Sequence, residues 1–181
     1  MKKIFLVAAS VAITNIMQAQ IYMGKTCVTH FFSKTSMKDI EAKSNTAKPV
    51  LDAASGNFQM RIQNTSFKFE SSFMEEHFNE NYLHTDKFPN ATYKGKLIGF
   101  TKDMLTKDGV YNISSSGQVT LHGVTKDFSS PVKLEVKGKT ATFNCIFKVK
   151  AEDYNIDIPG LVKPKLSEYT PLNATIVFQL N

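Results

Sequence analysis

Segments in which apolar and polar side chains alternate follow one another along most of this chain of 181 residues. Between positions 57 and 64, Phe58, Met60 and Ile62 occupy every second position, with polar residues between them. Successive side chains of a strand point to opposite faces, so this period of two indicates strands with one dry and one wet face. Such strands are expected at residues 26–33, 57–64, 91–99, 109–114, 117–122, 132–136, 141–149 and 173–180. A wet face excludes a parallel sheet flanked by helices and favours an antiparallel barrel or sandwich.

Two parts of the chain are less regular. Residues 36–42 fit either a further strand or a bend, and residues 43–47 are expected to form a polar turn. Between residues 71 and 83 the bulky residues recur at mixed steps of three and four: Phe73, Met74, His77, Phe78 and Leu83. This spacing predicts one or two turns of helix, with His77 as an orienting hydrogen-bond residue at a helix end.

The first twenty residues have the pattern of a secretory signal peptide. Lys2 and Lys3 precede an apolar run from position 4 to position 13, and Ala19 offers a small residue near a cleavage point. The run is too short to span a bilayer, which needs ~20 apolar residues. We therefore expect a signal peptide at residues 1–20 and a mature domain at residues 21–181 in an exported compartment; an uncleaved N-terminal anchor is the alternative.

The charge pattern argues against nucleic acid as a partner. The formal net charge is +6 and falls to +4 without Lys2 and Lys3. The remaining lysines alternate with apolar residues, as in Lys148-Val-Lys150, which is typical of a solvated strand face. A transient contact with a membrane surface is allowed by this charge, and a homodimer is left open.

The sequence does not have the residue patterns of common catalytic or metal sites. None of the four histidines is spaced to share a metal ion with another, there is no Gly-x-Ser-x-Gly motif, and carboxylates adjacent on a strand point to opposite faces. We therefore expect no enzyme activity, no metal and no cofactor. Cys27 and Cys145 could form a disulfide in an exported protein or remain buried thiols.

Aromatic residues are abundant, with 14 Phe, 6 Tyr and no Trp. A barrel of about eight strands encloses either packed side chains or one small ligand. The bulky residues before and within the predicted helix could line or cover an apolar cavity, or fill the core: Phe67, Phe69, Phe73, Met74 and Phe78.

Several motifs occur in a fixed order. Met74-Glu-Glu-His77-Phe78 is followed by Lys87-Phe88-Pro89-Asn-Ala91-Thr92-Tyr93, then by Leu121-His-Gly123-Val124-Thr125-Lys126, and finally by Phe147-Lys-Val-Lys-Ala-Glu-Asp-Tyr154-Asn-Ile156. Together with the early Phe31-Phe32-Ser33 segment they extend over the whole mature chain. They resemble the YceI-like family, a lipocalin-like group of exported proteins linked to polyisoprenoid binding.

The resemblance implies an all-β fold, an extended eight-stranded antiparallel lipocalin-like barrel with a short helix, around a tunnel for a long apolar lipid. It also implies a periplasmic location. The alternative is a filled barrel that serves as an envelope stress or protein-interaction module. The first and last strands look short, which suggests a shortened tunnel. The residues predicted to contact the ligand are Phe58, Met60, Ile62, Phe73, Met74, Phe78, Tyr93, Phe143 and Phe147.

Overall fold

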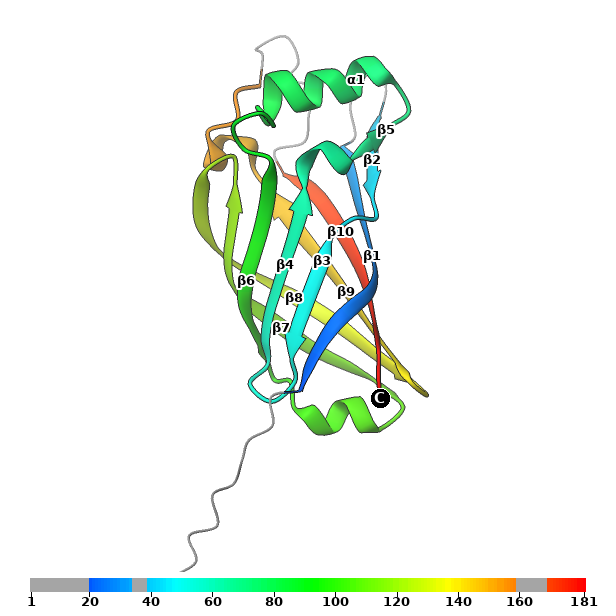
Figure 1. The fold of residues 1–181 in the computed structure, drawn as a ribbon. Helices are drawn as coiled ribbons and strands as arrows, with labels where there is room; N and C mark the ends of the chain where they lie inside the picture. Colours follow the sequence, from blue (N-terminus) through cyan, green and yellow to red (C-terminus); the bar gives the residue numbers. More distant parts are fainter. Residues whose placement is uncertain (1–19, 34–38, 159–168) are drawn as a thin grey trace, which may run out of the picture.

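A single antiparallel sheet that closes on itself forms the body of the molecule (Figure 1). The computed structural model describes residues 20–33, 39–158 and 169–181. Within them the strands are β1 (Ile21–Ser33), β2 (Ile40–Ser44), β3 (Lys48–Asp52), β4 (Asn57–Gln63), β5 (Lys68–Phe69), β6 (Asn90–Ile98), β7 (Gly109–Leu121), β8 (Val124–Lys137), β9 (Thr140–Val149) and β10 (Thr170–Gln179).

These strands occupy eight positions around a barrel. β2 pairs with the C-terminal part of β1 and β3 with its N-terminal part, so the two short strands share one position. β4 and β5 share the next position in the same way, since β4 pairs with β3 and β5 with β2. β10 then pairs with β1 and closes the ring. The predicted eight-stranded antiparallel barrel with a short helix is confirmed.

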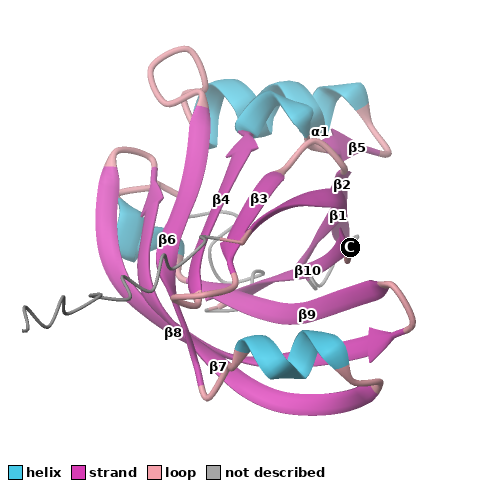
Figure 2. Ribbon diagram, turned by 60° about the horizontal axis from the view of Figure 1, so that its bottom comes forward, coloured by secondary structure: helices cyan, strands magenta, loops and turns pink. Residues whose placement is uncertain are grey.

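Short helices lie at both ends of the barrel. α1 (Ser72–His77) continues without a break into a π-helical turn, η2 (Phe78–Tyr82), and together they cover one end (Figures 1 and 2). η3 (Lys102–Thr106) lies at the opposite end, while η1 (Asn64–Ser66) and η4 (Ala151–Tyr154) interrupt the connections after β4 and β9. The helical stretch expected at residues 71–83 is confirmed.

The alternation in the sequence corresponds to the inside and the outside of the barrel. In β4 the side chains of Phe58, Met60 and Ile62 are buried and those between them are exposed. In β10 and the residue after it, every second residue from Ala174 to Leu180 is buried in the same way. Burying apolar side chains inward is the main source of folding free energy, so this pattern determines which face of each strand points inward.

Several predicted strand boundaries were wrong. The strands expected at residues 109–114 and 117–122 form one strand, β7, because Gly117 does not end it but pairs with Gly95 of β6. A Cβ atom at Gly117 would lie 2.3 Å from the Cα of Gly95, so glycine here permits the close approach of two strands. β1 begins at Ile21, five residues before the predicted start, so the expectation of a short first strand was also wrong.

Further differences concern β2, β3 and β8. Residues 43 and 44 continue β2 instead of opening a polar turn, and the start of the segment expected at 36–42 lies outside the described residues. β3 was not predicted; it contains Pro49, which usually argues against a strand. β8 begins at Val124 and is 14 residues long, far longer than the predicted segment at 132–136.

Candidate ligand cavity

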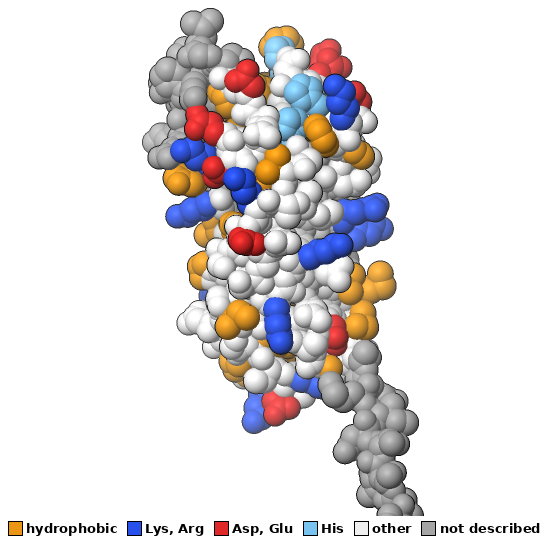
Figure 3. Space-filling model, turned by 90° about the vertical axis from the view of Figure 1, so that its left-hand side faces the viewer, with side chains coloured by type: hydrophobic (Ala, Val, Ile, Leu, Met, Phe, Trp, Pro, Cys, Tyr) orange, Lys and Arg blue, Asp and Glu red, His pale blue; other side chains and the backbone are white. Residues whose placement is uncertain are grey.

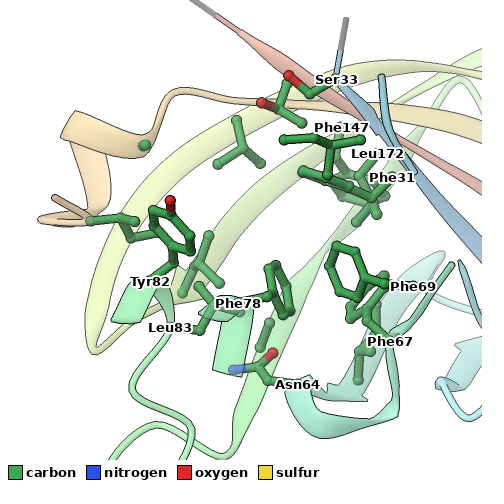
Figure 4. Close-up of a pocket in the computed structure, with 18 of the residues that line it drawn as sticks. Phe31, Ser33, Asn64, Phe67, Phe69, Phe78, Tyr82, Leu83, Phe147 and Leu172 are labelled. Carbon is green, nitrogen blue, oxygen red and sulfur yellow. The ribbon is translucent and has the colours of Figure 1, made fainter. Parts of the chain in front are cut away.

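A cavity of about 550 Å³ lies inside the barrel beneath α1 and η2 (Figure 4). Its volume falls within the range of small-molecule sites, roughly 300–1,000 Å³. Its lining residues are Phe31, Ser33, Ile40, Met60, Ile62, Asn64, Phe67, Phe69, Phe73, Met74, His77, Phe78, Tyr82, Leu83, Ala91, Thr92, Tyr93, Val119, Leu121, Phe147, Val149, Ala151, Ile156, Ile158, Thr170 and Leu172. Among these described lining residues there is no Lys, Arg, Asp or Glu, so the cavity is an apolar space with a few neutral polar groups.

Aromatic rings form the roof of the cavity. Phe78 of η2 packs against Phe69 with ring centres 4.9 Å apart, and against Phe67 at 5.8 Å. It also reaches Phe31 of β1, 6.2 Å away. Aromatic pairs at such distances attract one another beyond the effect of burial. The cluster therefore joins the helical segment both to β1 and to the residues just before α1, and it covers the cavity.

A second aromatic cluster closes the inner end of the cavity. Phe147 stacks on Phe128 with ring centres 5.0 Å apart, and Tyr93 meets Phe147 edge-on at 5.6 Å. The Tyr93 hydroxyl and the Ser115 hydroxyl form a hydrogen bond, and burial raises the pKa of Tyr93. These rings form a plug across the middle of the barrel.

Below the plug the barrel is packed. Tyr93 and Phe147 also border a second void of only about 10 Å³, together with Phe58 and Phe143. Phe143 is 1% exposed and meets Phe178 edge-on with ring centres 5.4 Å apart. The interior is therefore divided into an upper half with a cavity and a lower half filled by side chains.

One end of the helical cover is held by an ion pair. The Lys68 ammonium of β5 donates to Glu75 of α1, and the backbone N–H of Phe69 donates to the same carboxylate at 3.4 Å. The hydrogen bond from Lys68 lowers the pKa of Glu75. Because Phe69 is part of the roof, this carboxylate connects the helix to the aromatic cluster.

The other end is held by a pair of histidines. His84 Nδ1 lies 2.8 Å from His122 Nε2, and His122 Nδ1 lies 3.0 Å from the carbonyl oxygen of Tyr154. A carbonyl only accepts, so His122 carries a proton on Nδ1, and in the neutral ring Nε2 then accepts from His84. Both residues have positive φ, 43° and 49°. The pair connects the end of the helical cover, the β7–β8 turn and η4 at the cavity end of the barrel.

The residues predicted to contact the ligand lie partly in the upper half of the barrel and partly in its filled lower half. Seven line the cavity: Met60, Ile62, Phe73, Met74, Phe78, Tyr93 and Phe147. The other two, Phe58 and Phe143, point inward but lie below the plug. Phe73 is 65% exposed, so most of its side chain faces solvent.

Some lining residues were not among those predicted. Phe31 and Leu172 are directly opposite one another in the β1–β10 pairing, and Ser33 follows on the same face of β1. The alternation of β1 with Cys27 and Thr29 carries the signal that could have identified this face. Asn64 lies just after β4, two positions beyond Ile62, so the alternation of that strand could have placed it on the inner face although its side chain is polar.

His77, at the end of α1, has the hydrogen-bonding role expected for it. Its Nδ1 lies 2.9 Å from the side-chain nitrogen of Asn81 one turn later. In the described part of the chain no three His, Cys, Asp or Glu residues cluster as metal ligands would.

The two cysteines are free thiols. Cys27 of β1 and Cys145 of β9 both flank β10, so a strand lies between them. Burial raises the pKa of Cys27 to about 11 and that of Cys145 to about 12. The disulfide alternative is therefore not the state of this structure, and neither thiol is a ready nucleophile.

The outer surface carries its basic side chains singly. Figure 3 shows lysine and arginine side chains spread over one face without forming a stripe, while histidines gather near the helix-covered end. Among the described residues, no helix has the length and apolar character that crossing a bilayer requires.

A closed eight-stranded barrel with an apolar cavity under a helix belongs to the class of lipocalin-like barrels, whose interior can hold one small ligand. The YceI-like domain model matches residues 13–178, and the chain belongs to this family. No curated protein matches the sequence.

Solved structures share the fold at low sequence identity. A polyisoprenoid binding domain from Saccharophagus degradans, implicated in plant cell wall breakdown, is 14% identical, with a TM-score of 0.75 over 91% of this chain and 100% of that one. Burkholderia cenocepacia BcnA is 19% identical, with a TM-score of 0.67 over 84% and 96%. The Campylobacter jejuni YceI protein is 17% identical, with a TM-score of 0.60 over 100% and 99%.

Proposed function

We propose that this protein binds a single-chain apolar lipid of the polyisoprenoid type inside the upper half of its barrel. The observation that carries the proposal is the cavity itself, about 550 Å³ with no Lys, Arg, Asp or Glu among its described lining residues. Each Å² of apolar ligand surface removed from water there contributes roughly 25 cal/mol. A flexible hydrocarbon chain gains the most from such a space, because it needs few polar partners.

The family and a structural relative support the same class of ligand. The chain belongs to the YceI-like family, and the Saccharophagus degradans domain that shares its fold is described as polyisoprenoid binding. The filled lower half limits the space for a ligand to the part between the plug and the helix.

We further propose that the protein acts in the periplasm as a carrier and not as an enzyme. The charged start and short apolar run within residues 1–20 support export; that segment lies almost wholly outside the described residues. The raised pKa values of both thiols speak against nucleophilic catalysis by cysteine. A transient contact with a membrane surface is needed to load and release an apolar chain.

Native mass spectrometry with organic extraction tests the proposal. The purified protein should carry, or take up from an isoprenoid solution, one apolar molecule per chain. Val119→Phe should block uptake, because Val119 of β7 lines the cavity and is 9% exposed. Val110→Phe on the same strand is the matched control, since Val110 is 56% exposed and points outward.

A clean ligand-free mass with no uptake of any apolar chain would overturn the lipid-binding proposal. That outcome would favour the alternative of an envelope stress or protein-interaction module. Equal uptake by the Val119→Phe and Val110→Phe variants would show that the ligand binds elsewhere.

A further inference from the structure

The apolar cavity contains an unpaired hydrogen-bond acceptor. Asn64 is 1% exposed and lines the cavity between β4 and the helix (Figure 4). Its side-chain nitrogen donates to the carbonyl oxygen of Phe88 at 2.7 Å, and its backbone N–H donates to the carbonyl oxygen of Pro89 at 2.8 Å. In the described residues its side-chain oxygen Oδ1 accepts no hydrogen bond.

The orientation of this amide is fixed by its neighbour. The Phe88 carbonyl can only accept, so the amide nitrogen of Asn64 must face it and the oxygen must point the other way. A flip would place two acceptors together and would leave a buried donor unpaired. The unsatisfied group is therefore an acceptor, and it calls for a donor from the molecule that fills the cavity.

Ser33 provides a second neutral polar group. It is 1% exposed, lines the same cavity from the end of β1, and its hydroxyl oxygen has no partner in the described structure. Figure 4 shows Ser33 and Asn64 on opposite sides of the pocket. Because the two residues face each other across the pocket, a single hydroxyl bonded to Asn64 does not reach Ser33, and the head group is assigned to Asn64.

Charge in the lining gives a further constraint. The titratable side chains that line the cavity are His77, Tyr82 and Tyr93, and His77 already uses Nδ1 in its contact with Asn81. A carboxylate or phosphate drawn into this space would lose its water without gaining a fixed cation. The cavity therefore discriminates against an anionic head group.

The volume limits the length of the chain. A water-sized group occupies about 30 Å³. If a methylene is counted as one such group, about 550 Å³ holds roughly 18 of them. The plug of Tyr93 and Phe147 prevents a longer chain from extending into the lower half.

We propose that the occupant is an uncharged lipid of about twenty carbons whose head group, a hydroxyl or a primary amide, donates a hydrogen bond to Oδ1 of Asn64. The hydrocarbon tail then points toward Tyr93 and Phe147. This inference rests on the proposed function and adds the head group, the charge and the length of the ligand.

Three probes of one carbon skeleton test the head group by displacement of a fluorescent fatty chain: geranylgeraniol, its methyl ether and geranylgeranyl diphosphate. The alcohol should bind about tenfold more tightly than the ether, which cannot donate. The diphosphate should bind at least about tenfold more weakly than the alcohol, because its charge finds no partner inside.

Two variants test whether the preference for the alcohol over the ether depends on Asn64. Asn64→Ala should reduce the ratio of alcohol to ether affinity to about one while ether binding is retained. Asn57→Ala, at the exposed start of the same strand, is the matched control and should keep the full ratio. If Asn64→Ala does not fold, because its side-chain hydrogen bond to Phe88 is lost, the three probes on the unchanged protein still decide the question.

The outcomes separate this inference from the proposed function. Equal binding of alcohol, ether and diphosphate would place the head group outside the cavity and overturn the inference, while lipid binding itself would stand. Failure of all three probes to bind would contradict the proposed function. A C40 prenol that binds as tightly as the C20 alcohol would refute the length limit.

Discussion

Replacing Phe147 by alanine should lengthen the chain that the cavity accepts. The Phe147 ring stacks on Phe128 and separates the cavity from the small void beneath it. The substitution removes the six ring carbons, which leaves room for up to about six carbons of ligand. Each additional buried methylene contributes about 0.8 kcal/mol, or roughly fourfold in affinity. In the unchanged protein affinity should rise by this factor per carbon until the cavity is full and then level off; in the variant it should level off about four to six carbons later.

The measurement is a displacement titration with a homologous series of linear alcohols on both proteins. The variant should also lose about 3–5 kcal/mol of unfolding free energy from the new space, part of which a long ligand restores. Phe143→Ala is the control, because it removes an equally buried ring below the plug, beside Phe178. It should cost similar stability and leave the preferred chain length unchanged.

A folded Phe147→Ala protein with an unchanged length preference would refute the reasoning. It would mean that the chain ends elsewhere than at Phe147. A shift produced equally by Phe143→Ala would mean that the rings of the lower half do not act as a fixed floor.

Three further results are expected. Burial raises the pKa of Cys27 to about 11 and that of Cys145 to about 12, so the folded protein keeps these protons while unfolded thiols ionise near pH ~8.5. The stability they provide is complete below that pH and is lost as pH rises toward 11, at about 1 kcal/mol per thiol per pH unit. Urea unfolding at alkaline pH should show this decline, and replacing both cysteines by alanine should remove the part of it that lies below about pH 10, where tyrosines begin to ionise. His122→Gly should be about 1 kcal/mol more stable than His122→Ala in urea, because φ is 49° there and only glycine adopts it freely; equal stability would contradict this. Glu75→Gln should speed ligand release in stopped-flow measurements, because it loosens α1 from Lys68. In the unchanged protein the contact between Lys68 and Glu75 should weaken as pH falls through the lowered pKa of the Glu75 carboxyl. An unchanged release rate in the variant would show that α1 does not control release.

The barrel itself could be predicted from the sequence because strand alternation is a local property. Phe58, Met60 and Ile62 point inward for the same reason that Gln59 and Arg61 point outward, and no distant residue is needed to know it. The helical stretch around Phe78 could be predicted for the same reason, because its bulky residues recur at steps of three and four. The family motifs added the number of strands, which alternation alone left as a barrel or a sandwich.

The height of a residue along the barrel could not be predicted in this way. Phe58 and Ile62 share one face of β4, yet one lies in the filled half and the other at the cavity. The difference depends on where Tyr93 and Phe147, from β6 and β9, place their rings. Those strands are brought together by the pairing register, which local alternation does not specify.

The head-group site is the clearest case of what only the tertiary structure decided. The sequence determined that Asn64 follows a strand with a dry inner face. Its unpaired oxygen became visible only once the chain had placed the Phe88 carbonyl, 24 residues later, against its amide nitrogen. Burial follows from the order of residues along a strand, whereas a cavity and an unsatisfied polar group arise from packing between segments that are distant in the sequence.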